Sequence, residues 1–423
     1  MKIHVTQMVA LADTKIDISV SELPQRKKVI FRANMCLPWA KNVVFGSWAE
    51  FITDENGCVN LSKQIPINGN YKNADSMGLI TSMKLISGKI NAVGENISTD
   101  NNLFIDITAE CGEERGSVKI ERLFMSHDIK KEEILKPFVG AFYYSENPKN
   151  KTVLLLGGSG GKLGANLPLA SLLASHGFNV LTVAYFSEPG LPKELVNIPL
   201  EYFENVFSWL ANNTYTMGKD LYLYCISKGG ELGLILASMH DCIKKIVAVA
   251  PHAYCFQGIS FKKKSSSWTY QNKPLHFVRF QYSTLFTYIF GCIIKNQPFG
   301  YTHVYKTALR NARNKEAARI KVENIKADLL LISSKQNNMW NTYDGCVEIM
   351  NELDKVGYQY TYKHISYENA GEPFYAPYII PITIYEPMKI APRLSFFAGG
   401  TLEGNNEAVI DSWEKMLEFF TGN

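Results

Sequence analysis

Residues 221–238 read LYLYCISKGGELGLILAS, and this stretch decides how the rest of the chain is interpreted. An apolar run meets a tight Ser-Lys-Gly-Gly turn, and a helix-patterned segment follows at once. This is the layout of a nucleophile elbow, G-x-S-x-G, in which a strand turns sharply into a helix and exposes a serine. Ser227 occupies the serine position, but Cys225 stands where the first glycine of the motif belongs. The question is whether Ser227 can still act as a nucleophile.

The composition is that of a globular protein with more than one domain. The chain has 423 residues, of which 46% are hydrophobic and 20% charged, and it is too long for one ordinary core. The net charge of +4 is small for this length, and the basic run at 262–264 is local, so we expect no nucleic-acid partner. The longest apolar segment, residues 285–294, is shorter than the roughly 18 residues of a membrane span. We expect a buried helix there and no transmembrane segment.

The cysteines and the N-terminus predict a cellular compartment. The eight cysteines show no CxxC or Cys/His ligand spacing. Several of them, such as Cys225, Cys242 and Cys292, lie in apolar segments, and we interpret them as reduced, buried thiols. The N-terminal MKIHVTQMVALAD has no continuous apolar stretch, so no signal peptide is predicted. These features predict a cytoplasmic protein without a metal or a cofactor.

Residues 1–135 consist of short segments in which apolar and polar residues alternate. The predicted strands cover residues 14–20, 28–35, 42–51, 103–110 and 117–125. Period-two segments interrupted by turn-forming residues about every ten positions are typical of a β-sandwich. No cluster of His, Asp and Glu in this region suggests chemistry, so we interpret it as an accessory domain.

Residues 136–423 follow a different pattern, in which unbroken apolar strands alternate with helices. The strands are predicted at 152–156, 179–186, 220–225, 245–250, 327–333 and 359–365, and helices at 167–173, 201–210 and 412–420. This alternation indicates a mostly parallel sheet covered on both faces, and with the elbow it indicates an α/β-hydrolase domain. The alternation is interrupted around 256–315, which predicts an insertion over the carboxyl edge of the sheet, where such folds bind ligands.

A glycine cluster at 157–161, GGSGG, follows the first strand of this domain. Leu163 stands after Lys162 where a phosphate-binding P-loop needs Ser or Thr, and the glycine spacing is one residue too long for a dinucleotide fingerprint. In an α/β-hydrolase, the N–H after the nucleophile and an N–H from an earlier loop form the oxyanion hole. We therefore predict the N–H of Lys228 and an N–H within Gly158-Ser159 as oxyanion donors.

Several longer motifs resemble a known family. Residues 69–83, GNYKNADSMGLITSM, are similar to its G-x-Y-x-x-x-D-x-M-G-L-x-x-S-M segment, and LLLGGSGG, LLASHGFNVLTVAYF, PLEYFENVFSWL and CISKGGELGL follow in the family's order. Over nearly its whole length the chain resembles the acyl-CoA thioesterases and bile acid-CoA:amino acid N-acyltransferases. The resemblance implies an N-terminal immunoglobulin-like sandwich, an α/β-hydrolase domain, and acyl transfer from a CoA thioester onto Ser or Cys.

The resemblance also assigns a catalytic triad, and this chain departs from it at two positions. The nucleophile falls on Ser227. The family's aspartate falls on Asn337 in ISSKQNNMWNT, and its histidine falls on Glu372 in YENAGEP. A glutamate has an ordinary pKa of about 4.3 and is a weak base unless burial raises that pKa. An asparagine cannot stabilise an imidazolium by charge.

One of the eight histidines is placed to replace the missing base. His252, in APHAY, follows the strand after the elbow, at the edge of the sheet where Ser227 is expected. One hypothesis is that His252 acts as the base and Glu372 orients it; the alternative is a histidine packed at a strand end.

The function that the sequence favours is acyl-CoA thioester hydrolysis or acyl transfer through an acyl-Ser227 intermediate. CoA then enters only as part of the substrate. A pseudoenzyme that binds acyl-CoA or lipid is the first alternative. A general serine esterase is the second, because the same residues serve non-CoA esters and a fold does not fix a function.

Overall fold

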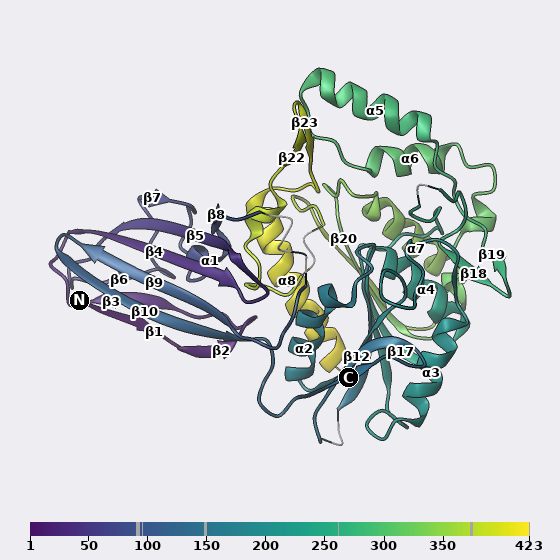
Figure 1. Cartoon of the computed structure of the whole chain (residues 1–423), viewed down its shortest axis with the longest axis horizontal. Helices are drawn as coiled ribbons and strands as arrows, with labels where there is room; N and C mark the ends of the chain where they lie inside the picture. The colour runs from purple at the N-terminus through teal and green to yellow at the C-terminus, as the bar shows by residue number, and fades with distance from the viewer. Residues whose placement is uncertain (90–93, 95, 148–149, 261, 373–374, 423) are drawn as a thin grey trace. The chain divides into compact units, whose positions relative to one another are not determined.

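The computed structural model describes residues 1–89, 94, 96–147, 150–260, 262–372 and 375–422 (Figure 1). The chain divides into two compact units, residues 1–127 with 376–384, and residues 128–375 with 385–423. The stretch 376–384 therefore belongs to the first unit although it comes late in the sequence. The predicted boundary after residue 135 falls just behind strand β11 (Lys130–Ile134), which pairs within the second unit.

The first unit is built from β-sheets that are antiparallel apart from one strand pair, as its alternating sequence predicts. The larger sheet has the order β2-β10-β9-β4-β5-β7, with β8 paired to β5, and a smaller sheet has the order β1-β3-β6. In β4 (Lys28–Leu37) every second side chain is buried, so one face of this strand contributes to a core. The remaining strands are β1 (Lys2–Val5), β2 (Val9–Leu11), β3 (Ile18–Ser21), β5 (Ala40–Ile52), β6 (Val59–Asn60), β7 (Asn68–Gly69), β8 (Lys84–Ser87), β9 (Leu103–Cys111) and β10 (Glu114–Leu123).

The second unit contains an eight-stranded sheet in the order β11-β12-β14-β13-β16-β17-β20-β21. The first two pairings, β11 with β12 and β12 with β14, are antiparallel, and the other five are parallel. This confirms the predicted α/β-hydrolase class with a mostly parallel sheet. The strands after β11 are β12 (Val139–Tyr144), β13 (Lys151–Leu156), β14 (Phe178–Ala184), β16 (Leu221–Ile226), β17 (Ile243–Val249), β20 (Asp328–Ser334) and β21 (Tyr362–Tyr367).

Helices cover both faces of this sheet, as unbroken apolar strands require (Figure 1). Side chains of β16 alternate between the faces: Tyr222 stacks on Phe420 of one helix, whereas Leu223 and Cys225 join the core on the other side. The helices are α2 (Leu167–Ser175) and α8 (Leu402–Thr421) on the first face, and α3 (Tyr202–Asn212), α4 (Lys228–Met239) and α7 (Thr342–Val356) on the second.

The region predicted as an insertion, 256–315, holds helices α5 (Tyr282–Lys295) and α6 (Thr302–Arg310), and its Phe261 lies outside the described residues. The same region also holds the short strands β18 (Trp268–Tyr270) and β19 (Lys273–Pro274), which form a separate sheet with β15 (Ile198–Pro199). The expectation of a buried helix at 285–294 is half wrong. The segment is helical, but Cys292 is its one buried residue, because the helix packs through a single face. No described helix is long and apolar enough to cross a membrane.

The prediction of buried thiols holds for two of the three cysteines it named. Cys225 and Cys292 are buried, but Cys242 is exposed, because it lies in the turn just ahead of β17 and not within the strand.

Candidate active site

Ser227 lies in the turn between β16 and α4, and its backbone has the unusual conformation of a nucleophile elbow. Its φ is +55° and its ψ is −120°, a region that residues other than glycine rarely occupy and that often marks functional sites. Its N–H donates to the carbonyl of Val249 over 2.8 Å, and its carbonyl accepts from Gly230 N–H over 2.8 Å. The turn is therefore fixed to the neighbouring strand and to the helix, while the side chain stays partly exposed.

The departure from the elbow motif at Cys225 is accommodated by a glycine on the helix. A Cβ at Gly233 would lie 2.6 Å from the Cys225 Sγ, so the missing side chain of Gly233 is what makes room for this thiol. A Cβ at Gly229 would lie 2.3 Å from the carbonyl oxygen of Gly157, so the helix also needs a glycine where it crosses the loop. Burial raises the pKa of Cys225 well above its ordinary value, which makes this cysteine a packed, unreactive thiol.

The glycine cluster lies directly against the nucleophile. A Cβ at Gly158 would lie 3.1 Å from the Ser227 Cβ, and residues 157–161 line a cavity of about 180 Å³ together with Ser227 and Glu372. Lys228 is the first residue of α4, so its N–H is one of the helix donors that have no partner within the helix. The structure thus brings Gly158, Ser159 and Lys228 around Ser227, and their role as oxyanion donors stays a prediction.

Glu372 provides a carboxylate next to Ser227: both residues line the small cavity, and the Ser227 hydroxyl favours the charged form of this carboxylate. The carboxyl group is enclosed by protein atoms, although the residue keeps some exposure toward the small cavity. Burial raises the pKa of Glu372 to about 7, and the hydrogen bonds from Ser227 and Asn337 lower it only in part. A carboxylate with this pKa is half protonated near neutral pH, where a general base is most effective.

Asn337 is buried and holds Glu372 from the other side. The Asn337 Oδ1 accepts hydrogen bonds from the backbone N–H groups of Met339 (2.8 Å) and Trp340 (3.3 Å). These two bonds fix which way the amide points, so its Nδ2 faces the carboxylate and donates to Glu372 Oε2 over 3.3 Å. Ser227, Glu372 and Asn337, which the resemblance assigned to one triad, therefore lie together: Glu372 lines the small cavity with Ser227 and accepts a hydrogen bond from Asn337.

His252 is placed elsewhere, inside an aromatic cluster. The residue is fully buried; its ring lies 4.8 Å from that of Phe256 and 5.7 Å from that of Trp340, and its Nδ1 accepts from Tyr254 N–H over 3.3 Å. Burial lowers the pKa of His252 to about 3, against a smaller opposite effect of the Asn341 amide. Among the contacts of His252 with described residues, none is with Ser227 or Glu372. The base role of His252 stays a prediction.

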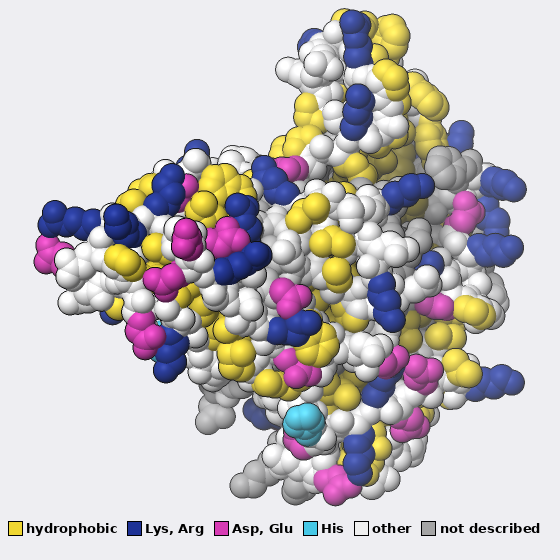
Figure 2. All heavy atoms as spheres, turned by 60° about the vertical axis from the view of Figure 1, so that its left-hand side comes forward, with side chains coloured by type: hydrophobic (Ala, Val, Ile, Leu, Met, Phe, Trp, Pro, Cys, Tyr) yellow, Lys and Arg dark blue, Asp and Glu magenta, His cyan; other side chains and the backbone are white. Residues whose placement is uncertain are grey.

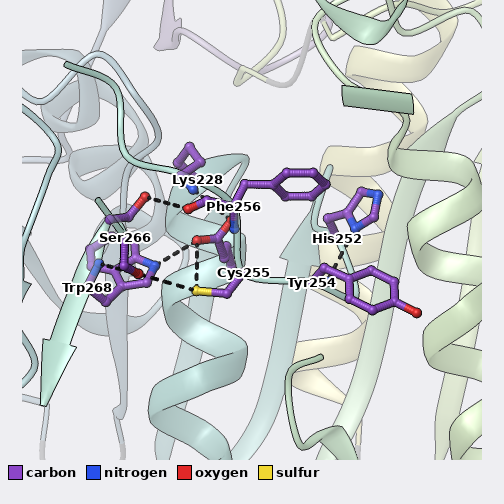
Figure 3. A network of polar contacts seen from close by, with 9 residues as sticks. Lys228, His252, Tyr254, Cys255, Phe256, Ser266 and Trp268 are labelled. Carbon is purple, nitrogen blue, oxygen red and sulfur yellow. Dashed lines mark hydrogen bonds and ion pairs between the residues drawn. The ribbon is translucent and has the colours of Figure 1, made fainter. Parts of the chain in front are cut away.

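A buried ion pair under the elbow was missed by the sequence analysis. Lys228 Nζ lies 2.7 Å from Glu231 Oε2, one turn along α4, and both side chains are shielded from solvent. Glu231 also accepts from the indole N–H of Trp268 over 2.7 Å and from the backbone N–H of Phe256 over 3.2 Å (Figure 3). The i, i+3 spacing of a lysine and a glutamate was visible in the sequence, but such pairs are usually exposed.

A second, larger cavity opens from the other side of Ser227. It measures about 550 Å³, and its wall includes Ser159, Ser227 and Lys228. The insertion contributes its aromatic and aliphatic side chains to this wall, among them Phe280, Tyr282, Leu285, Tyr301 and Tyr305. Ser227 is thus at the junction of a small cavity that contains a carboxylate and a large apolar one. Among the described residues, no group of three or more His, Cys, Asp and Glu could hold a metal ion.

Known proteins resemble the chain along almost its full length. Acyl-coenzyme A thioesterase 2, mitochondrial, of Mus musculus is 24% identical over 96% of this chain and 86% of its own length. Acyl-coenzyme A amino acid N-acyltransferase 1 of Mus musculus is 25% identical over 99% of this chain and 97% of its own. The crystal structure of a putative dienelactone hydrolase from Klebsiella pneumoniae aligns with a TM-score of 0.40 and 14% identity, over 70% of this chain and 98% of that one.

Two family profiles match the two halves of the sequence. The N-terminal region of the acyl-CoA thioester hydrolase/BAAT proteins matches residues 13–136, and the BAAT/acyl-CoA thioester hydrolase C-terminal region matches residues 198–423, more than half of the chain. The protein therefore belongs to the acyl-CoA thioester hydrolase/BAAT family.

Proposed function

We propose that this protein cleaves acyl-CoA thioesters through an acyl-Ser227 intermediate, with Glu372 as the general base. The observation that carries the proposal is that Glu372 lines the same cavity as Ser227 and accepts a hydrogen bond from Asn337, while burial brings the pKa of its carboxyl to about 7. A serine hydroxyl needs a nearby proton acceptor with a pKa close to the working pH. Glu372 meets this need without a histidine.

The two departures from the family's triad compensate each other chemically. An imidazole base donates an N–H to an aspartate, which orients it and stabilises its charge. A carboxylate base has no N–H to donate and needs a donor instead, which the Nδ2 of Asn337 provides. Both pairs carry one negative charge before proton transfer. An aspartate at 337 would place a second negative charge beside Glu372, so a glutamate base favours an asparagine partner.

The proposed reaction has two half-reactions at Ser227. Glu372 accepts the hydroxyl proton while Oγ bonds to the thioester carbonyl carbon, and N–H donors at Lys228 and Gly158-Ser159 bind the oxyanion. The C–S bond breaks, and the CoA thiolate takes the proton from Glu372 and leaves. Glu372 then accepts a proton from water or an amine, which attacks the acyl-serine. The bond between the acyl carbon and Oγ breaks, Oγ takes the proton back from Glu372, and the acyl product leaves.

The larger cavity is the proposed site of the acyl chain. Its wall is mainly apolar and includes Ser227, which suits a hydrocarbon chain attached to the reacting carbonyl. The relatives' names describe a thioesterase and an amino acid N-acyltransferase, so water and an amine are both candidate acceptors. A cytoplasmic location stays a prediction, since the thioesterase relative is mitochondrial by name.

The proposal is tested with a fluorophosphonate probe and a chain-length series of acyl-CoAs. We expect the probe to label the wild type at Ser227, and CoA release to be lost in Ser227→Ala. Ser238→Ala, a half-buried serine on the same helix, is the matched control and should keep full activity. Labelling with turnover of simple esters only would identify a general serine esterase. Bound acyl-CoA without labelling or turnover would identify a pseudoenzyme.

His252 and Glu372 are separated by one further comparison. If Glu372 is the base, His252→Gln should retain most of the activity once the variant is shown to be folded. If His252→Gln is folded and as inactive as Ser227→Ala, the base is His252 and the present assignment is wrong.

A further inference from the structure

The insertion carries an excess of positive charge that the net charge of the chain conceals. Residues 256–315 contain ten Lys and Arg and no Asp or Glu, so the rest of the chain has a net charge of −6. Among the described residues, two of these ten have a carboxylate partner: Lys306 pairs with Asp344 over 3.0 Å and Lys315 pairs with Glu348 over 2.7 Å. The positive charge of the insertion is therefore largely uncompensated.

Helix α5 of the insertion also exposes an apolar stripe. Phe286, Phe290 and Ile294 follow each other at intervals of four residues, which places them along one side of the helix. Their side chains are 70%, 64% and 66% exposed. A row of large apolar side chains this exposed usually marks an interaction site. Lys295 lies in the last turn of α5, and the Lys264 Nζ lies 5.3 Å from the ring centre of Tyr282 in the first turn.

The same helix forms part of the wall of the large cavity. Tyr282 and Leu285 of α5 line the large cavity, whose wall also includes Ser227. Tyr282 lies one turn before Phe286, so the row that begins at the cavity wall continues into the exposed stripe. In Figure 1, α5 lies at the top of the second unit. Figure 2 shows hydrophobic and basic side chains together on the same part of the molecule. The first turn of α5 thus borders the cavity, and the rest of the row is an exposed apolar stripe with basic groups nearby.

We propose that the apolar stripe and the basic groups of the insertion bind the surface of an anionic lipid membrane, with α5 lying in the interface. Helices that lie in a membrane interface insert a row of apolar side chains at the level of the lipid headgroups, and nearby Lys and Arg side chains attract anionic lipids. The contact is peripheral, and it would place the wall of the cavity next to the membrane, where long-chain amphiphiles concentrate.

Charge argues against a second copy of the chain as the occupant of this surface. A symmetric dimer through α5 would bring two insertions together, each with ten basic residues and no acidic one, and like charges at close range repel. An acidic protein partner would satisfy the charge, but it would not require three exposed side chains as large as these in a row. An anionic bilayer satisfies both features.

The test is flotation of the purified full-length protein with lipid vesicles, which needs no turnover and so does not depend on the proposed function. We expect flotation with phosphatidylcholine vesicles that contain about 30 mol % phosphatidylserine and none with phosphatidylcholine alone. Raising the salt from about 0.1 M to about 1 M should weaken binding, because the charges are exposed.

Two sets of variants separate the apolar and the basic contributions. F286Q/F290Q/I294Q should reduce the fraction bound at least tenfold, whereas I65Q/I67Q/M217Q, which changes three other exposed apolar side chains, should bind like the wild type. K262Q/K263Q/K264Q should weaken binding more than K2Q/K41Q/K72Q, which removes the same number of exposed charges elsewhere.

Three outcomes would overturn the inference. The first is wild-type protein that does not float with anionic vesicles, and the second is undiminished binding of F286Q/F290Q/I294Q. The third is self-association of the wild type in solution that this triple variant abolishes, which would assign the stripe to a second copy. A fourth result would also contradict the inference. If the wild type and the triple variant bind polyglutamate equally well, and as strongly as they bind vesicles, charge alone explains the binding.

Discussion

Two buried glutamates on either side of the elbow have very different surroundings. Glu231 contacts a lysine ammonium, an indole N–H and a backbone N–H, and every one of these groups donates to it. Glu372 has a serine hydroxyl and an asparagine amide as partners. A buried carboxylate whose partners all donate to it, one of them a cation, serves structure. One that is buried with fewer donors and no cation has a raised pKa and can exchange a proton. The comparison shows that partners, and not burial alone, decide which role a glutamate has.

Replacing Glu372 should produce the largest effect. Glu372→Gln keeps the shape and an acceptor for Asn337 but cannot accept the serine proton, so we expect kcat to fall by about 10²–10⁴-fold. Glu368→Gln is the control and should leave the activity unchanged, because Glu368 is an exposed glutamate that follows β21, as Glu372 does, and pairs with Lys335. CoA release measured by thiol titration distinguishes the two. If Glu372→Gln retained its activity, Glu372 would not be the general base.

Replacing Glu231 should instead destabilise the folded protein. Glu231→Ala leaves the Lys228 ammonium buried without a partner, which costs about 3–5 kcal/mol of unfolding free energy. Urea denaturation measures the change. The double variant Lys228→Met/Glu231→Leu removes both charges and should recover most of the loss, because no buried charge then remains unpaired. A double variant as unstable as the single one would show that the pair itself is needed.

The pH dependence of stability should separate the two glutamates further. The pKa of Glu372 is raised from 4.5 to about 7 in the folded protein, so between these values the folded state binds more protons than the unfolded state. The contribution of Glu372 to stability is therefore greatest below pH 4.5 and is lost as pH rises toward 7. At pH 8 Glu372→Gln should be more stable than the wild type by up to about 3 kcal/mol. Equal unfolding free energies at pH 8 would contradict the raised pKa.

The partner of Glu372 should set the position of the acid limb of the pH–rate profile. In the wild type, kcat/KM should rise with pH through about 7, because Glu372 acts as a carboxylate. Asn337→Asp adds a negative charge and removes a donor, so the limb should move up by about one pH unit. A limb that moves down, or does not move, would show that Asn337 does not act on Glu372.

The smallest effect is expected at Cys225. Cys225→Gly restores the glycine of the motif and should change kcat by less than about threefold, since the thiol does not contact the Ser227 hydroxyl and burial keeps it unreactive. Gly233→Ala should be the more harmful change, because the new methyl would meet the Cys225 Sγ. Combining the two substitutions should relieve that clash. Thermal melts and initial rates on the three variants measure the difference.

The sequence predicted most of the fold, because the fold depends on local patterns. All the strands predicted for the second domain lie within three residues of observed ones; the one at 359–365, for example, is β21 at Tyr362–Tyr367. The elbow at Ser227 followed from a strand, a turn and a helix adjacent in the chain. The role of Gly233 in holding Cys225 was not predictable, since it depends on how a helix and a strand approach each other.

The properties of the site were harder to predict than its residues. The resemblance placed Ser227, Glu372 and Asn337 together, but the raised pKa of Glu372 comes from burial, which the sequence does not show. His252 was noted because it follows a strand. In the structure its ring packs against Phe256, four residues later, and Trp340, which is distant in the sequence. The exposed stripe of α5 was hidden by a run of apolar residues that resembled a core helix.

The stretch 376–384 has a practical consequence for anyone who wishes to study the units separately. It begins four residues after Glu372, yet it belongs to the first unit, where Ala376, Ile379 and Ile382 are buried and the Thr383 hydroxyl donates to the carbonyl of Met83. A fragment that starts at residue 128 would therefore leave these side chains uncovered, close along the chain to the carboxylate. Neither unit can be cut out as one continuous piece, so a shortened protein that has lost activity would say little about the chemistry of Ser227.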